Sequence, residues 1–177
     1  EPGQKWLHSL YDFIQHENVI EITYQPFYME EPYQRTVSPY LLKEYDNRWI
    51  LVCYDHRREA IRNFALDRLL GITKVPVRFH HLPEFDPRQY FEHIIGITLP
   101  HGAPIEQIDF EVPRDDAKYL LTKPIHQSQI VLEESEEAYI FRIEVIPNFE
   151  LESVLLSFGD RLTLLKPQSL KKQLKER

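Results

Sequence analysis

The stretch from Gln34 to Leu70 limits the possible folds of this chain more than any other part. It alternates apolar and polar residues and is rich in β-branched and aromatic side chains, with a turn signal at Asp46-Asn47 and a polar run over residues 55–59. Alternation with a period of two predicts strands, and turn residues between two such runs predict hairpins. We therefore expect three short antiparallel strands here.

The flanking segments extend this sheet. Residues 4–17 place apolar side chains at three- and four-residue spacing, which predicts an amphipathic helix, and residues 19–25 alternate like a half-buried strand. Residues 69–77 supply one more strand. A helix and about five short strands, without room for crossover connections, predict a small antiparallel barrel or curled sheet.

The same region is basic, although the chain as a whole is acidic. Residues 34–78 contain nine Lys/Arg and five Asp/Glu, whereas the net charge of the 177-residue chain is −7. An acidic total argues against a surface that coats nucleic acid as a whole. Any nucleic-acid binding is therefore expected within the basic segment.

Three motifs in this segment carry a family resemblance. They are Pro39-Tyr40, the triplet Trp49-Ile50-Leu51, and the run Arg62-x-Phe64-x-Leu66-Asp67-Arg68. Together they resemble the signature of the WYL domain, a family of bacterial regulator domains named for a Trp-Tyr-Leu triplet whose middle position is Ile50 here. The order of the later segments resembles the C-terminal extension that often follows WYL domains. The resemblance implies an Sm-like barrel, in agreement with the strand pattern.

A second domain is predicted after a linker. We place the linker over residues 80–104, with a short helix that starts at Asp86-Pro87. From residue 105 the pattern runs strand, helix, strand, strand, helix, strand, which is typical of a ferredoxin-like domain. The predicted fold class is thus α+β: a small Sm-like antiparallel β-barrel with an N-terminal helix over residues 1–79, then a ferredoxin-like extension over residues 105–177.

A strand pair and a capped helix are also expected in the second domain. Residues 125–133 and 139–146 are expected to form strands around an acidic turn. Asn148 is expected to cap a helix with acidic residues in its first turn, which suits the positive end of the helix dipole. Gly159 is expected to close that helix.

The arginines of the basic segment are candidate phosphate ligands because the planar guanidinium donates two parallel hydrogen bonds to phosphate oxygens. If residues 62–68 formed one continuous strand, Arg62 and Arg68 would share a face with Phe64. The two arginines must then emerge at the ends of the strand or be redirected by a bulge. For Arg68 a structural ion pair with Asp67 is an equally good interpretation. Arg57 lies on a loop, where a solvated charge is the alternative. The candidates are Arg35, Arg57, Arg62 and Arg68.

Aromatic side chains form the second half of the predicted site, because nucleobases stack on exposed rings. Tyr40 and Tyr54 are the candidates for stacking or for hydrogen bonds to bases. Trp49 is either a stacking residue or the largest core residue of the barrel. Phe64 and Asp67 are assigned structural roles.

No catalytic or metal-binding motif stands out. The histidines are scattered, and Cys53 lies in an apolar run, which indicates a buried and inert thiol. We therefore expect no enzyme activity, metal or cofactor. A single cysteine, no apolar run of membrane-spanning length and no signal peptide favour a cytoplasmic protein. The chain begins Glu1-Pro2-Gly3 without methionine, so we expect it to be part of a longer protein.

The resemblance implies the ligand-sensing regulatory part of a bacterial transcriptional regulator. Its implied partners are a nucleic-acid-like effector, such as single-stranded DNA or a short oligonucleotide, and DNA bound through a helix-turn-helix domain not present in this chain. The C-terminal extension would support a homodimer. Two alternatives remain: a protein-interaction and dimerisation module without a small effector, and an enzyme acting on nucleotides.

Overall fold

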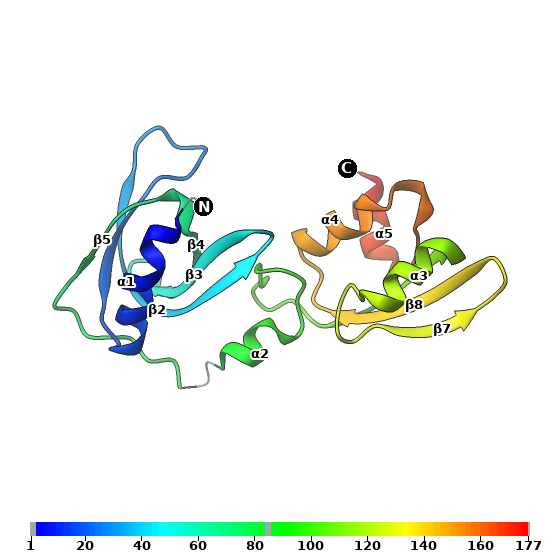
Figure 1. Ribbon diagram of the computed structural model, residues 1–177, viewed down its shortest axis with the longest axis horizontal. Helices are drawn as coiled ribbons and strands as arrows, with labels where there is room; N and C mark the ends of the chain where they lie inside the picture. Colours follow the sequence, from blue (N-terminus) through cyan, green and yellow to red (C-terminus); the bar gives the residue numbers. More distant parts are fainter. Residues whose placement is uncertain (1–2, 84–85, 177) are drawn as a thin grey trace. The chain divides into compact units, whose positions relative to one another are not determined.

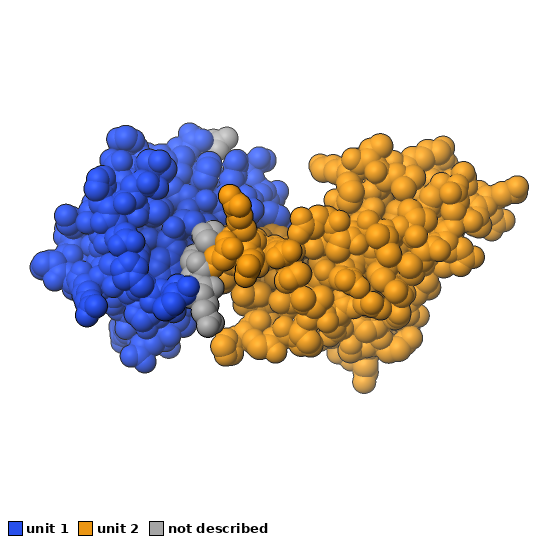
Figure 2. All heavy atoms as spheres, turned by 90° about the horizontal axis from the view of Figure 1, so that it is seen from below, with its two compact units in different colours: residues 1–85 blue, residues 86–177 orange. Residues whose placement is uncertain are grey.

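The computed structural model describes residues 3–83 and 86–176, which divide into two units, each with its own hydrophobic core. Unit 1 spans residues 1–85 and unit 2 spans residues 86–177 (Figures 1 and 2). Among the described residues no helix is both long enough and apolar enough to cross a membrane.

The described residues of unit 1 form one α-helix, two short 3-10 turns and one antiparallel sheet (Figure 1). The helix packs against the sheet with Leu10 fully buried. Its elements are α1 Leu7–Gln15, β1 Ile20–Tyr24, β2 Tyr33–Tyr45, β3 Arg48–Asp55, β4 Ala60–Ala65 and β5 Leu69–Lys74.

The strand order of this sheet is β4-β3-β2-β1-β5, and every neighbouring pair is antiparallel. The α+β class is confirmed, but a closed Sm-like barrel is not, because no pairing joins β4 to β5 in the described parts of the chain. The expected continuous strand from Arg62 to Arg68 is also interrupted. β4 ends at Ala65, and Leu66–Arg68 form a 3-10 turn that leads into β5.

Local sequence explains the two irregular points of the long strand β2. Asp46 and Asn47, which follow it, have φ values of 50° and 57°, the left-handed conformation that tight hairpin turns need and that Asp and Asn adopt most readily after Gly. The register of β2 against β3 shifts between Pro39 and Leu41. Proline has no N–H for the ladder, and such a shift bends the strand and redirects Tyr40.

The core of unit 1 lies on one face of the sheet. Paired strands place Val37 opposite Asp55 and Leu51 opposite Phe64 on this face. Full burial of one such apolar side chain contributes about 1.5–3 kcal/mol, so the alternation along β1 fixes which of its faces turns inward. The buried core residues are Leu10, Ile20, Ile22, Tyr24, Val37, Leu51, Cys53, Phe64, Leu66 and Leu69.

Unit 2 carries a second antiparallel sheet, with strand order β7-β8-β6-β9. The helices α3, α4 and α5 lie on one side of it (Figure 1). The strand expected over residues 125–133 begins only at Ile130, because residues 126–129 form a turn. The elements are α2 Pro87–Glu92, β6 Glu106–Pro113, α3 Arg114–Thr122, β7 Ile130–Glu134, β8 Ala138–Val145, α4 Phe149–Ser157, β9 Thr163–Lys166 and α5 Gln168–Lys175.

The start of α4 holds the segment that precedes the sheet. The Asn148 Oδ1 accepts the N–H of Leu151 at 2.8 Å, which is the expected cap, and its Nδ2 donates to the carbonyl of Ile95 at 2.7 Å. The Glu150 Oε1 accepts the N–H groups of Ile97 and Thr98, both at 3.0 Å. Residues 95–98 are thereby fixed to unit 2.

Candidate functional site

Two tyrosines mark the centre of the basic region. Tyr24 at the end of β1 pairs directly with Tyr33 at the start of β2, with ring centroids 5.8 Å apart. The Tyr24 ring also meets the edge of Phe64 at 5.0 Å. Phe64 is buried and thus supports Tyr24 from the core.

Arg35 lies beside this tyrosine pair. Its guanidinium is 4.3 Å from the centroid of the Tyr33 ring, and its Nε is 3.5 Å from the Asp55 Oδ2. Asp55 is fully buried and Arg35 nearly so. The ion pair with Asp55 therefore holds Arg35 in a fixed position.

Arg68 approaches the same tyrosines from the 3-10 turn. Its Nη1 donates to the Tyr24 hydroxyl at 3.5 Å, and its guanidinium lies 4.3 Å from the centroid of the Phe27 ring. Its Nε is 4.0 Å from the Asp67 Oδ1, too far for a hydrogen bond, and neither atom has another hydrogen-bond partner in the described structure. Asp67 also lies 3.6 Å from Arg48, so it is shared and does not lock Arg68.

Arg62 is the exposed member of the group. It pairs with Cys53 in the β3–β4 ladder and therefore shares a face with Val37, Asp55 and Arg35. Within residues 3–83 and 86–176 it has no carboxylate partner. We call Arg35, Arg62 and Arg68, gathered around Tyr24 and Tyr33, the arginine cluster.

The tyrosines of the cluster remain protonated. Burial raises the pKa of Tyr24 against the lowering effect of Arg68. Burial, and then Tyr24, raise the pKa of Tyr33, while Arg35 and Arg62 lower it. Both phenols are therefore hydrogen-bond donors at neutral pH. The cluster contains three cationic groups, of which Arg35 is paired with Asp55, and two hydroxyls, a set suited to phosphate oxygens.

The predicted aromatic residues do not join this cluster. Tyr54 precedes Asp55 in a regular strand, so it points to the opposite face of the sheet, and its ring stacks on His80 at 3.7 Å. The Tyr40 hydroxyl donates to the His80 carbonyl at 2.7 Å, and burial raises the pKa of Tyr40 to about 12. The two tyrosines instead hold residues 79–81 against the sheet.

Two further predicted residues lie outside the cluster. Arg57 is exposed on the turn after β3, and its backbone N–H donates to the Asp55 Oδ1 at 2.9 Å. Trp49 is half-buried against the core, and with Tyr40 it lines an apolar hollow of about 640 Å³ beside α1. The core interpretation of Trp49 therefore fits its position better than stacking.

Tyr24, Tyr33 and Phe27 were missed by sequence reasoning. Tyr24 was assigned only to a half-buried strand, and no functional role was assigned to residues 26–32, which form the turn between β1 and β2. The available signal was the pair of tyrosines at either end of that turn, because residues that flank a hairpin turn are brought opposite each other.

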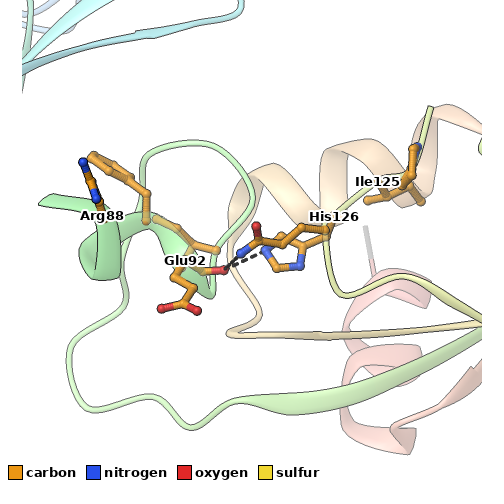
Figure 3. A pocket seen from close by; sticks show the side chains of 8 residues that line it. Arg88, Glu92, Ile125 and His126 are labelled. Atoms are coloured by element: carbon orange, nitrogen blue, oxygen red, sulfur yellow. Dashed lines mark hydrogen bonds between the residues drawn. The ribbon is translucent and has the colours of Figure 1, made fainter.

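Unit 2 contains a hollow of about 710 Å³ with a mixed lining (Figure 3). His126 and Gln127 both bond to the Glu92 carbonyl, at 2.9 and 3.3 Å. Burial lowers the pKa of His126. The His126 ring and the Gln127 side-chain amide are thus satisfied within the protein. Among the described residues that line the hollow, Arg88 alone carries a permanent positive charge. No group of three or more metal-ligating side chains occurs among the described residues.

These observations define the chain as a two-unit α+β protein with a basic cluster on its first unit. Residues 5–74 match the model of the WYL domain, and residues 104–177 match the model of the WCX domain. The two matches together cover most of the sequence. The chain belongs to the WYL-domain family, with a WYL domain followed by a WCX domain.

Two solved structures are similar over 98% of this chain. Proteasome accessory factor B/C (PafBC) of Arthrobacter aurescens is 20% identical with a TM-score of 0.47, and a CRISPR Cas-related protein is 13% identical with a TM-score of 0.57. The chain spans 26% of the first protein and 50% of the second. The second similarity supports the fold. No curated protein sequence gives a significant match.

Proposed function

We propose that this chain is the ligand-sensing part of a bacterial transcriptional regulator and that the arginine cluster binds a nucleic-acid-like effector. The observation that carries this proposal is the convergence of three arginines, from β2, β4 and the 3-10 turn, on one tyrosine pair. Arg62 carries a charge that no carboxylate of the described structure neutralises. Phosphate groups are the partner that such a cluster favours.

In this proposal the role is regulatory and not catalytic, and it is exercised in the cytoplasm. DNA is bound by a helix-turn-helix domain elsewhere in a longer protein. An effector changes the equilibrium between regulator states only by the difference in its affinity for those states. The exposed position of Arg62 supports the proposal because a ligand can reach it without unfolding the core.

Fluorescence anisotropy with a labelled oligonucleotide tests this function. Three phosphate contacts predict a slope of about −2 for log K against log salt concentration with a single strand. Arg62→Ala should weaken binding and flatten the slope by about 0.7. Arg78→Ala is the matched control, because Arg78 is an exposed arginine of the same unit outside the cluster. If Arg62→Ala binds as tightly as the parent, Arg62 does not belong to the site.

A specific observation also favours self-association, which the family resemblance implies. Strand β7 is an edge of its sheet, and three consecutive apolar residues on it are exposed: Ile130, Val131 and Leu132. An exposed apolar edge strand is a template for pairing with another chain. We therefore propose that a second copy pairs through β7.

Sedimentation equilibrium tests this second proposal. Leu132→Lys should convert a dimer into a monomer because lysine on an edge strand opposes pairing. Leu156→Lys is the control, since Leu156 is similarly exposed but lies on α4. A dimer that persists in Leu132→Lys would remove β7 from the interface.

A further inference from the structure

The turn between β1 and β2, residues 25–32, exposes large side chains without an evident structural reason. Phe27 is 77% exposed and Tyr28 is 85% exposed. The turn itself is well held: Gln25 donates its N–H to the Arg68 carbonyl at 3.1 Å, and its Nε2 donates to the Glu30 carbonyl at 2.8 Å. These rings are thus presented to solvent on a fixed support.

The turn arises directly from the arginine cluster. Its two ends are Tyr24 and Tyr33, which pair with each other. The Arg68 guanidinium lies 4.3 Å from the Phe27 ring centroid and also contacts the Tyr24 hydroxyl. One arginine therefore connects the tyrosine pair, of which Tyr24 is buried and Tyr33 half-buried, to the exposed Phe27 ring.

We propose that Phe27 and Tyr28 form a base-stacking platform beside the arginine cluster and that the ligand is accordingly a single-stranded nucleic acid with unpaired bases. This inference rests on the proposed function. Exposed rings next to guanidinium groups match the two parts of a nucleotide, because aromatic rings stack on bases while cations bind phosphates. A duplex keeps its base faces inside the stack and cannot use such a platform.

The charges along the turn support a contact with bases at this point. Glu30 and Glu31 follow the two rings and are exposed. Carboxylates repel phosphates, so the backbone of a bound strand is favoured on the side of the arginines. The uncharged bases are then directed to Phe27 and Tyr28. Every base has a flat face, so the platform is expected to show little sequence preference.

Fluorescence anisotropy with three probes tests the platform. The probes are a mixed-sequence single strand of about ten nucleotides, within the range that such sites cover, an abasic strand of equal length, and the corresponding duplex. For Phe27→Ala/Tyr28→Ala, the affinity for the single strand should fall at least ~10-fold, since stacking contributes roughly 1–3 kcal/mol per base. Affinity for the abasic strand and the salt slope should remain those of the parent.

Tyr11→Ala is the matched control, because Tyr11 is an exposed tyrosine of the same unit on α1. All three substituted side chains are exposed, so the variants are expected to keep the parent's unfolding midpoint. The platform is overturned if the double variant binds the single strand as tightly as the parent, or if the parent binds duplex and single strand equally. A parent that binds none of the probes at low salt would instead overturn the proposed function itself.

Discussion

Arg35 and Asp55 form an ion pair between adjacent strands, with the Arg35 Nε 3.5 Å from the Asp55 Oδ2. The other oxygen of Asp55 accepts the N–H groups of Arg57 and Arg58, at 2.9 and 3.2 Å. Asp55 thus closes the β3–β4 turn and neutralises one member of the arginine cluster. The ion pair uses Oδ2 and the turn hydrogen bonds use Oδ1, so different substitutions of Asp55 affect the two interactions differently.

Asp55→Asn should strengthen oligonucleotide binding. The amide oxygen can still accept both N–H groups of the turn, whereas the charge that neutralises Arg35 is lost. A gain of ~1 kcal/mol, or about fivefold in Kd, is expected for one additional unpaired charge near the protein surface. Anisotropy at fixed salt measures it, with Glu44→Gln as control because Glu44 is an exposed acid of the same unit. Unchanged or weaker binding with an intact fold would show that Arg35 does not contact the ligand.

Asp55→Ala should destabilise unit 1 more than Asp55→Asn, which also removes the counter-charge of Arg35 but keeps an acceptor for the turn. Both turn N–H groups lose their acceptor, and Arg35 is left nearly buried without a counter-charge. Removal of one partner from a buried pair costs about 3–5 kcal/mol in the free energy of unfolding. Urea denaturation measures this loss. Glu44→Ala, an exposed substitution, should change the free energy by less than ~0.5 kcal/mol.

The periodicity and local chemistry of the sequence were enough to predict strands and a helix cap. The pattern along residues 34–65 correctly predicted strands, and Cys53 is buried as its apolar run indicated. The cap by Asn148 followed from local chemistry and is observed. Both features depend on residues close together in the chain.

Features that depend on residues far apart in the chain could not be predicted from the sequence in the same way. The sequence could not show that Tyr54 and Arg62 point to opposite faces, because that requires the register of β3 against β4. Arg68 reaches Tyr24 only because the chain leaves the strand after Ala65 and makes a 3-10 turn. The prediction of one combined site for arginines and for Tyr40 and Tyr54 failed at this point.

His56 should make the attachment of residues 79–81 sensitive to pH. The Ser38 Oγ is hydrogen-bonded to the His56 Nε2 at 2.8 Å and accepts the N–H of His80 at 3.0 Å. Burial, and then His80, lower the pKa of His56. The stabilisation is therefore complete above the unfolded value near 6.5 and is lost as pH falls through the lowered folded value.

Hydrogen exchange at the His80 amide measures this effect. Protection, corrected for the intrinsic rate, should fall in the parent between pH 7 and pH 5, and the loss should be smaller in His56→Gln. His8→Gln is the control because the His8 side chain is 91% exposed. Equal pH dependence in parent and His56→Gln would show that another group controls the segment.

Asp109 should govern the acid stability of unit 2. Its carboxylate accepts the Arg142 Nε at 2.7 Å and Nη2 at 2.9 Å, and Lys166 lies 3.2 Å away. Hydrogen bonds from Arg142 lower the pKa of Asp109. The stabilisation is thus present above the unfolded pKa, about 3.9, and is lost as pH falls through the lower folded value.

Asp109→Asn should therefore unfold with less dependence on pH below about 4, as followed by circular dichroism. At pH 7 it should lower the free energy of unfolding by about 2 kcal/mol, since hydrogen bonds to charged groups contribute ~1.5–3 kcal/mol. Asp160→Asn is the control at an exposed position. An acid transition identical to that of the parent would assign acid sensitivity to other carboxylates.

Gly96 should be the least replaceable glycine of unit 2, because it lies against the carboxylate that holds residues 97–98. Its φ is 75°, and a Cβ added there would come within 2.6 Å of the Glu150 Cγ. Gly102 is the matched control: its φ is 67°, but a Cβ there would meet no atom within 4 Å. Both alanine variants incur the backbone cost of about 1–2 kcal/mol for a left-handed residue. Only Gly96→Ala must also displace Glu150, so its free energy of unfolding should fall by at least ~1 kcal/mol more than that of Gly102→Ala.

Chemical denaturation of both variants, alone and combined with Glu150→Ala, separates the cost of the left-handed backbone from the cost of displacing Glu150. The extra cost should shrink when Glu150 is already alanine, because the two positions are in contact and their effects then do not add. Equal effects of the two glycine substitutions would mean that Glu150 moves aside freely and does not hold residues 97–98.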